Sequence, residues 1–324
     1  MVSVELPRVV VDDPLPPIVS RLLAGHVECV PWEAVRAGEK QAVDGVYAYG
    51  HQAIDGPWLD RLTGVRVISN HGVGVDHIDL DAATARGIPV GHTPGVLDGA
   101  TADMGFALLL AAARRLIVGD RFARGPDFNH YDPGKLLGLE VHGQTIGIVG
   151  LGRIGLHVAR RAAGFDMRIL YHNRRPRTDL PAGLNAEYRQ LDELLAQSDF
   201  VMLCVPLGPE TAGLIDRPRL ARMKPTAVLV NIARGGVVDT EALTEALRDR
   251  RIYAAALDVT DPEPLPREHP LLASEHLVIA PHLGSATEQT RQAMAELSVE
   301  NLLRGLRGQS LLHQANGSLG FSAP

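Results

Sequence analysis

The run Thr145–Gly155, TIGIVGLGRIG, restricts the fold of this chain more than any other part of the sequence. Apolar residues typical of a buried strand lead into Gly150, Gly152 and Gly155, and a helical pattern follows at residues 156–163. In such a strand, turn and helix, the first glycine makes the tight turn. The second lets the backbone approach a pyrophosphate, and the third lets helix and strand pack closely. The sequence therefore predicts a dinucleotide site at the N-terminus of this helix.

The end of the next predicted strand bears on the choice of cofactor. A site for NAD normally has an acidic residue there, which accepts a hydrogen bond from the ribose 2'-hydroxyl. This chain has Asn173, Arg174 and Arg175 instead. Guanidinium groups cannot accept such a bond, but they bind a 2'-phosphate through paired, charged hydrogen bonds. The segment favours NADPH, while NAD and a simple solvated basic loop stay open as alternatives.

Short apolar runs recur along the chain in two series. The first comprises residues 9–11, 45–49, 65–69 and 88–91, and the second comprises TIGIVG, RILYH, FVMLCV, AVLVNI, YAAALD and LVIA from residue 145 onward. Near-continuous apolar runs that alternate with helical patterns are typical of parallel sheets covered on both faces. A chain of 324 residues is long enough for two such domains.

Two helices mark the predicted crossings between the domains. Residues 101–124 are predicted to form one long apolar helix, and Ser285 and Glu288 are spaced as a capping box before a last helix. No strand pattern follows that helix, so we expect it to return to the first domain. The predicted domains are a discontinuous substrate (catalytic) domain, residues 1–99 plus 285–324, and a dinucleotide-binding domain, residues 100–284.

Composition excludes several classes of function. The net charge is only -6, and the arginines form no basic tract with interleaved aromatic residues, so we expect no nucleic acid partner. Two cysteines provide neither a disulfide framework nor the spacing of metal ligands, so no metal is predicted. The apolar stretch 104–113 is too short to cross a bilayer, and the N-terminus lacks a signal-peptide pattern. A cytoplasmic location without membrane contact is expected.

Three polar side chains follow strands of the second series: Arg234 in NIARGG, Glu263 in LDVTDPEP and His282 in APHLGS. Open α/β sheets bind ligands at this edge. Arg234 can clamp a carboxylate and polarise a carbonyl beside it. His282, whose ordinary pKa is near neutrality, can exchange a proton with the substrate oxygen. Glu263 would orient the imidazole and favour its protonated form. Together they are the groups needed to reduce a 2-keto acid.

A second glycine-rich turn, NHGVGVDH at residues 70–77, follows a strand of the first series. Exposed amides of Val73 and Gly74 would form a nest for an anion such as the substrate carboxylate. An ordinary turn between a strand and a helix is the alternative.

These motifs resemble the D-isomer-specific 2-hydroxyacid dehydrogenase family over residues 45–310 or so. The segments GVGVDHIDLDAATARGIPVGHTPGVL, GIVGLGRIG, NIARGGVVD, LDVTDPEPLP and PHLGSAT are most similar to its glyoxylate and hydroxypyruvate reductase branch. The resemblance implies two doubly wound parallel-sheet α/β domains, a Rossmann dinucleotide-binding domain inserted in a flavodoxin-like substrate domain. It also implies NADPH-dependent reduction of small 2-keto acids to D-2-hydroxy acids.

The same resemblance assigns residues. It implies Arg234 as the substrate clamp, Glu263 and His282 as the acid–base pair, and Val73, Gly74 and Ser285 as further substrate contacts. The implied cofactor contacts, beyond the glycines and the basic segment, are Thr101, Arg153, Ile154, Val205, Pro206, Ile232 and Asp258. The long helix and the loop after it would form a homodimer, and the cleft between domains would close over the substrate.

One segment departs from the family pattern and leaves the substrate open. Where related reductases often have tryptophan, residues 126–133 read PDFNHYDP. Glyoxylate, hydroxypyruvate, 2-ketogluconate and a phenyl-bearing keto acid are therefore all retained. Outside keto-acid reduction, the alternatives are a dinucleotide-sensing binding protein of the same fold and a related dehydrogenase that oxidises formate or phosphite.

Overall fold

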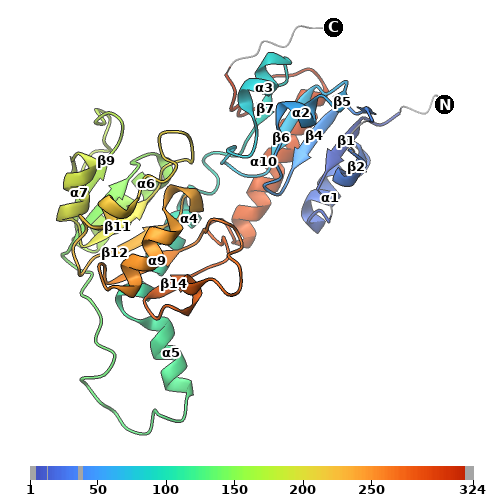
Figure 1. Cartoon of the computed structure of the whole chain (residues 1–324). Helices are drawn as coiled ribbons and strands as arrows, with labels where there is room; N and C mark the ends of the chain where they lie inside the picture. The colour runs from blue at the N-terminus through green and yellow to red at the C-terminus, as the bar shows by residue number, and fades with distance from the viewer. Residues whose placement is uncertain (1–4, 13, 36–38, 318–324) are drawn as a thin grey trace. The chain divides into compact units, whose positions relative to one another are not determined.

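A computed structural model describes residues 5–12, 14–35 and 39–317 (Figure 1). The chain divides into two compact units. Unit 1 comprises residues 1–97 and 287–324, and unit 2 comprises residues 98–286. In the described ranges, no helix is both long and apolar enough to span a membrane.

Unit 1 is built on a five-stranded parallel sheet in the order β2-β1-β4-β6-β7. In chain order these strands are second, first, third, fourth and fifth, which is the flavodoxin-like arrangement. Their bounds are β1 (Arg8–Val11), β2 (Glu28–Pro31), β4 (Gly45–Ala48), β6 (Val67–Asn70) and β7 (Val90–Gly91). A separate parallel pair is formed by β3 (Gln41–Ala42) and β5 (Leu62–Thr63). The helices are α1 (Pro17–Leu23), η1 (Trp32–Ala34), α2 (Gly56–Leu59), α3 (Leu80–Ala85) and α10 (Glu288–Leu306).

The core of unit 1 follows from alternation along its strands, because successive side chains of a strand point to opposite faces. Val10, Val46 and Ile68 pack in one buried cluster, whereas Val9 and Tyr47 pack in the other. The last helix, α10, belongs to this second cluster through residues 295, 299 and 302. Segments at the two ends of the chain therefore share one core.

Unit 2 contains a seven-stranded parallel sheet in the order β10-β9-β8-β11-β12-β13-β14. Its first six positions repeat the 3-2-1-4-5-6 order of a Rossmann domain. The strands are β8 (Thr145–Val149), β9 (Arg168–His172), β10 (Ala186–Tyr188), β11 (Phe200–Leu203), β12 (Val228–Asn231), β13 (Ala254–Leu257) and β14 (Leu277–Ile279). The helices are α4 (Asp98–Ala113), α5 (Leu116–Arg124), α6 (Arg153–Gly164), α7 (Leu191–Gln197), α8 (Arg217–Leu220), η2 (Gly235–Val237), α9 (Thr240–Arg248) and η3 (Pro270–Ala273). The predicted α/β fold class is confirmed.

The register of this sheet brings three loops to one edge. Asn231 at the end of β12 pairs with Leu257 at the end of β13, which pairs with Ile279 at the end of β14. Because the three strands are parallel and end at the same level, the segments that follow them leave the sheet side by side. These segments carry Arg234, Glu263 and His282.

Two details of the sequence prediction are wrong. Residues 101–124 are not one helix, since α4 ends at Ala113 and α5 starts at Leu116, with Arg115 in the left-handed region at φ 52°. The last helix is capped by Thr287, whose hydroxyl accepts from the Thr290 amide at 3.1 Å, and not by Ser285. The prediction of one helix followed the pattern of apolar residues, which continues across Arg115 and does not record its φ. The prediction of the cap followed the spacing of Ser285 and Glu288, but Thr287 also has a hydroxyl group that can cap a helix.

Candidate active site

The glycine-rich turn between β8 and α6 has the geometry that binding of a dinucleotide requires. Gly150 has φ 96°, where other residues are strained, and a Cβ there would lie 2.8 Å from Val205. A Cβ on Gly155 would lie 2.2 Å from the Gly150 carbonyl oxygen. No atom would be met within 4 Å by a Cβ on Gly152, so the backbone there is open. The turn thus fits a pyrophosphate above the N-terminus of α6, where amides without a helical partner and the helix dipole favour an anion.

Two side chains from the end of β9 hold this turn. Asn173 accepts a hydrogen bond from the Leu151 amide at 2.7 Å, and Arg177 donates to the Leu151 carbonyl at 2.9 Å. Arg177 also pairs with Asp179 at 2.6 Å, which raises the pKa of the arginine and lowers the pKa of the aspartate. Asn173 therefore supports the glycine turn directly, a contact that its spacing alone did not indicate. Arg177 is a supporting residue that the sequence analysis missed, although it stands in the same basic run.

The remaining arginines of this segment are exposed to solvent. Arg174 lies 3.4 Å from Glu210, with both side chains more than 70% exposed, so the pair adds little stability. Arg175 is exposed beside it. Both guanidinium groups stand next to a turn shaped for a dinucleotide.

His282 and Glu263 form the central pair at the other end of the site. Their Nδ1 and Oε1 atoms are 2.8 Å apart, and both side chains are partly exposed, 29% and 38%. A carboxylate can only accept, so Nδ1 carries the proton and donates. This hydrogen bond fixes the tautomer of the neutral ring, in which Nε2 is the nitrogen that carries no proton.

Asp258 fixes the backbone that carries His282. Its carboxylate accepts from the amides of Leu283 and Gly284, both at 2.7 Å, and its carbonyl accepts from the His282 amide at 2.8 Å. Burial raises the pKa of Asp258, and the two amides oppose that rise. His282 itself has φ 56°, an uncommon conformation for histidine, so three hydrogen bonds from one residue stabilise it. Predicted as a cofactor contact, Asp258 is also a structural support.

The Arg234 loop is tied to the same region. Asn231 accepts from the Ala233 amide at 3.0 Å and donates to the Arg234 carbonyl at 2.8 Å, which closes a short turn after β12. A Cβ on Gly235 would lie 2.0 Å from the Thr260 carbonyl, so only glycine lets this loop pack against the Glu263 loop. The signal for this contact was present in the sequence as the Gly-Gly pair after Arg234.

The other predicted cofactor and substrate residues of unit 2 are placed as follows. Thr101 is buried in α4 beside Gly284, since a Cβ on that glycine would lie 3.3 Å from its methyl group. Ile232 is buried in the core at 6% exposure. Val205 contacts the glycine turn, the carbonyl of Pro206 accepts from Thr211, Arg153 and Ile154 form the first turn of α6, and Ser285 is half-buried after Gly284.

Val73 and Gly74 belong to unit 1, in the loop that follows β6. Among the described residues, no hydrogen bond from either backbone amide is found. Both amides are therefore available to an anion.

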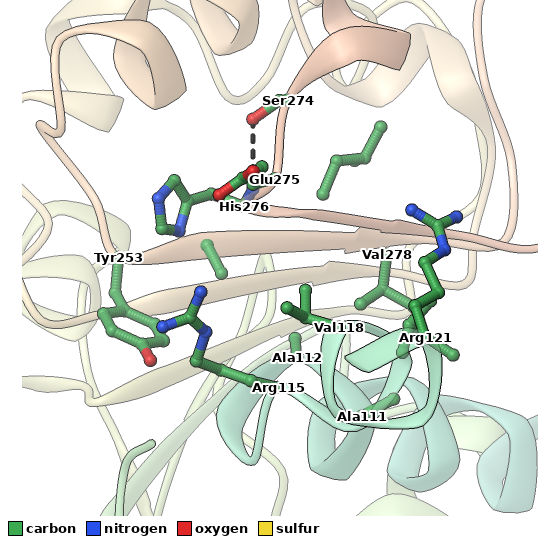
Figure 2. Close-up of a pocket in the computed structure, with 13 residues that line it drawn as sticks. Ala111, Ala112, Arg115, Val118, Arg121, Tyr253, Ser274, Glu275, His276 and Val278 are labelled. Atoms are coloured by element: carbon green, nitrogen blue, oxygen red, sulfur yellow. Dashed lines mark hydrogen bonds between the residues drawn. The ribbon is translucent and has the colours of Figure 1, made fainter. Parts of the chain in front are cut away.

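A pocket of about 180 Å³ lies elsewhere in unit 2 (Figure 2). It is lined by Arg115, Val118 and Arg121 near and on α5 and by Tyr253 and His276 opposite. Neither the glycine turn nor any of the three polar residues at the sheet edge lines it. In the described part of the chain, no group of three or more His, Cys, Asp or Glu side chains is arranged to hold a metal ion.

Comparison with known proteins identifies the family. Residues 106–284 match the family model described as D-isomer specific 2-hydroxyacid dehydrogenase, NAD binding domain. The chain is 44% identical to a glyoxylate reductase of Pyrococcus furiosus, over 94% of this chain and 93% of that protein. Among solved structures, one from Thermus thermophilus is 46% identical, with a TM-score of 0.86 over 95% of this chain and 99% of that one.

A second solved structure carries the same fold at lower identity. An NADPH-dependent glyoxylate/hydroxypyruvate reductase of Sinorhizobium meliloti, in complex with NADP and malonate, is 32% identical, with a TM-score of 0.88 over 98% of this chain and 99% of that one. The glycine turn and the Rossmann strand order agree with the description of the family model as an NAD binding domain. The chain belongs to the D-isomer specific 2-hydroxyacid dehydrogenase family and is an NAD(P)-dependent dehydrogenase that interconverts 2-keto and 2-hydroxy acids.

Proposed function

We propose that this protein reduces glyoxylate and hydroxypyruvate to D-2-hydroxy acids with NADPH, and that His282 is the general acid. The observation that carries the proposal is the 2.8 Å contact between His282 and Glu263, at the carboxyl edge of a sheet whose first turn fits a dinucleotide. The relatives named glyoxylate reductase support the substrate class. In this proposal residues 100–284 form the dinucleotide-binding domain, and residues 1–99 with 285–324 form the substrate domain.

The residues divide the work as follows. A bound nicotinamide would supply the hydride for the carbonyl carbon. The turn at Gly150, Gly152 and Gly155 would hold its pyrophosphate. Nε2 of His282 donates a proton to the nascent alkoxide, and Glu263 stabilises the charged imidazolium before transfer.

Other groups would orient the substrate. We propose that Arg234 binds the substrate carboxylate and carbonyl as a planar, bidentate donor, and that the amides of Val73 and Gly74 bind the same carboxylate. Ser285, next to the segment held by Asp258, is proposed as a further substrate contact. A carboxylate common to all the candidate keto acids would thus be recognised before the side chain is distinguished.

Substitution of His282 tests the assignment. We expect His282→Ala to lower kcat with NADPH and glyoxylate by about 10² to 10⁴-fold and to leave the Kd for NADPH unchanged. His142→Ala removes an exposed histidine of the same unit and serves as the matched control. An unchanged kcat in His282→Ala would refute the role. Tight binding of NADPH by wild-type protein without reduction of any keto acid would instead favour a dinucleotide-sensing protein.

The preference for NADPH is proposed from Arg174 and Arg175, because two guanidinium groups can pair with a 2'-phosphate. Replacing both by alanine is expected to lower kcat/KM for NADPH by about 10 to 100-fold and to leave that for NADH unchanged, since hydrogen bonds to charged groups contribute more than neutral ones. Arg248→Ala, an exposed arginine of unit 2, is the control. Equal efficiency of wild-type protein with NADH and NADPH would contradict the proposal.

We also propose that the protein is a homodimer. In unit 2, α5 has no buried residue, and Figure 1 shows it extending away from the sheet with the segment that follows it. Large apolar side chains are exposed along this stretch: Leu116 60%, Ile117 42%, Phe128 51%, Tyr131 82% and Leu137 70%. A cluster of this kind on a soluble protein marks an interaction surface, and the pocket of Figure 2 lies against the same helix.

Sedimentation measures this directly. We expect wild-type protein to sediment as a dimer and Leu116→Glu to sediment as a monomer, because a charge would be buried without a partner. Leu6→Glu changes an exposed leucine of unit 1 and should leave the mass unchanged. A wild-type monomer at micromolar concentration would refute the dimer.

A further inference from the structure

The backbone carbonyl groups of the loop after β6 have hydrogen-bond partners within unit 1. The Gly72 carbonyl accepts from the Asn70 side chain at 2.9 Å and from the Thr93 amide at 3.2 Å. The Gly74 carbonyl accepts from the same Asn70 nitrogen at 2.8 Å, and the Val73 carbonyl lies 3.1 Å from His92 Nδ1. Three consecutive carbonyl groups of this loop, those of Gly72, Val73 and Gly74, thus lie within hydrogen-bond distance of side chains or backbone of unit 1.

Because the peptide unit is planar and trans, the position of each carbonyl group fixes the direction of the next N–H group. The N–H of one residue points opposite to the carbonyl of the residue before it. Since Asn70 holds the Gly72 carbonyl, the Val73 N–H points away from Asn70. The Val73 carbonyl is held by His92, so the Gly74 N–H points away from His92. Both amides are turned out of the hydrogen-bond network that fixes the loop.

The start of the loop is anchored in the core. The His71 amide donates to the Ala48 carbonyl at 2.8 Å, and its carbonyl accepts from the Thr93 hydroxyl at 2.8 Å. Its ring, which is 3% exposed, lies with Nδ1 3.0 Å from the Tyr47 hydroxyl, and that hydroxyl lies 2.8 Å from Ser298 on α10. The loop therefore cannot pivot about its first residue without breaking buried hydrogen bonds.

We propose that Asn70 is a positioning residue for the substrate: its side-chain amide fixes the Gly72 and Gly74 carbonyls so that the intervening amides form a preorganised carboxylate site. This inference rests on the proposed function, in which Val73 and Gly74 bind that carboxylate. Asn70 is 2% exposed and both of its contacts to the loop come from one nitrogen, Nδ2, so it acts through the backbone and does not itself meet the substrate. Preorganised dipoles cost no reorganisation on binding, and their loss appears as weaker binding of the anion.

Steady-state kinetics of Asn70→Ala test the inference. We expect the KM for glyoxylate to rise about tenfold or more, with the KM for NADPH unchanged and kcat reduced much less. The methyl ester of glyoxylate has no carboxylate charge, so its kcat/KM should change little, and the preference of wild type for acid over ester should shrink. Asn70→Ser keeps one donor and should lie between wild type and Asn70→Ala.

Asn316→Ala is the matched control, because Asn316 also donates to a backbone carbonyl of unit 1, at Ile88. Cooperative unfolding followed by tryptophan fluorescence checks that each variant folds; if Asn70→Ala does not, Asn70→Ser carries the test. An unchanged KM for glyoxylate, or equal losses for acid and ester, would overturn the inference. If wild-type protein reduced no keto acid, the proposed function would fail, independently of Asn70.

Discussion

Protonation of His71 should destabilise unit 1 in mildly acidic solution. Burial, and then the positive charge of Arg291, lower its pKa from 6.5 to about 4. Tyr47 and Tyr49 face the ring from β4 and from the residue after it, and burial raises the pKa of Tyr47 far above this range. The carboxylate of Asp12 raises the pKa of Tyr47 further, and it accepts hydrogen bonds from the Tyr49 and Gly50 amides at 2.6 and 2.7 Å. The ring is therefore neutral in the folded state and protonated in the unfolded state between these two values of pH.

The magnitude follows from linkage. A pKa that is lower in the folded state means that the unfolded chain binds more protons, so stability rises with pH. The contribution is fully present above pH 6.5 and is lost as the pH falls toward 4. The shift of about 2.5 units, at about 1.4 kcal/mol per unit, corresponds to about 3 kcal/mol at the acidic limit. That is a large part of the stability of an ordinary domain.

Urea unfolding at pH 7.5, 6.5, 5.5 and about 4.5 measures this loss. The chain has two tryptophans, Trp32 and Trp58, stacked at 4.4 Å in unit 1, so their fluorescence reports unit 1. We expect His71→Gln to be less stable at neutral pH but to lose most of the slope between pH 6.5 and about 4.5. His26→Gln, at an exposed histidine of unit 1, should keep the wild-type slope. A slope unchanged in His71→Gln would refute the reasoning.

Three further outcomes are expected. Gly155→Ala places a methyl carbon 2.2 Å from a backbone carbonyl oxygen and should weaken NADPH binding at least tenfold in a fluorescence titration. Gly164→Ala on the same helix is the control, because its methyl carbon meets no atom within 4 Å. Equal affinities of the two variants for NADPH would contradict the packing argument. Glu263→Gln should lower kcat/KM about 10 to 100-fold with the Kd for NADPH unchanged, and an unaltered pre-steady-state rate would remove Glu263 from the mechanism. Burial raises the pKa of both cysteine thiols, that of Cys204 to about 12, so iodoacetamide should label the exposed Cys29 faster than the half-buried Cys204 in native protein, as mass spectrometry would show; faster labelling of Cys204 would contradict this order.

The sheets could be predicted from the sequence because strands that are buried on both faces have apolar residues at consecutive positions. Runs of this kind gave all the strands of unit 2 except β10, which has three residues with a charged one in the middle. In unit 1, β2 escaped prediction for a related reason: it is an edge strand whose residues are mostly exposed. Edge strands bury less surface, so their pattern is weaker.

For the candidate site, the spacing of motifs predicted some residues, whereas others are recognised only from their contacts in the structure. Glu263 and His282 were predicted as a pair, and they lie 2.8 Å apart. The sequence did not predict that the side chains of Asp258 and Arg177 support these loops. Each of them binds backbone groups that are distant in sequence, and spacing does not reveal such contacts. The break at Arg115 depends on one backbone angle, which no periodicity records.

If His282 is the general acid, as proposed, its left-handed backbone makes the requirements of stability and of activity conflict at this residue. At φ 56°, glycine or asparagine would be less strained than histidine, and the carboxylate of Asp258 would hold either just as well, because it binds only amides there. A library of variants at position 282, screened for heat resistance alone, should therefore discard histidine, whereas a screen for turnover should recover it. Selection for stability alone would therefore replace His282 by a residue that tolerates a positive φ, whereas selection for turnover would retain the histidine.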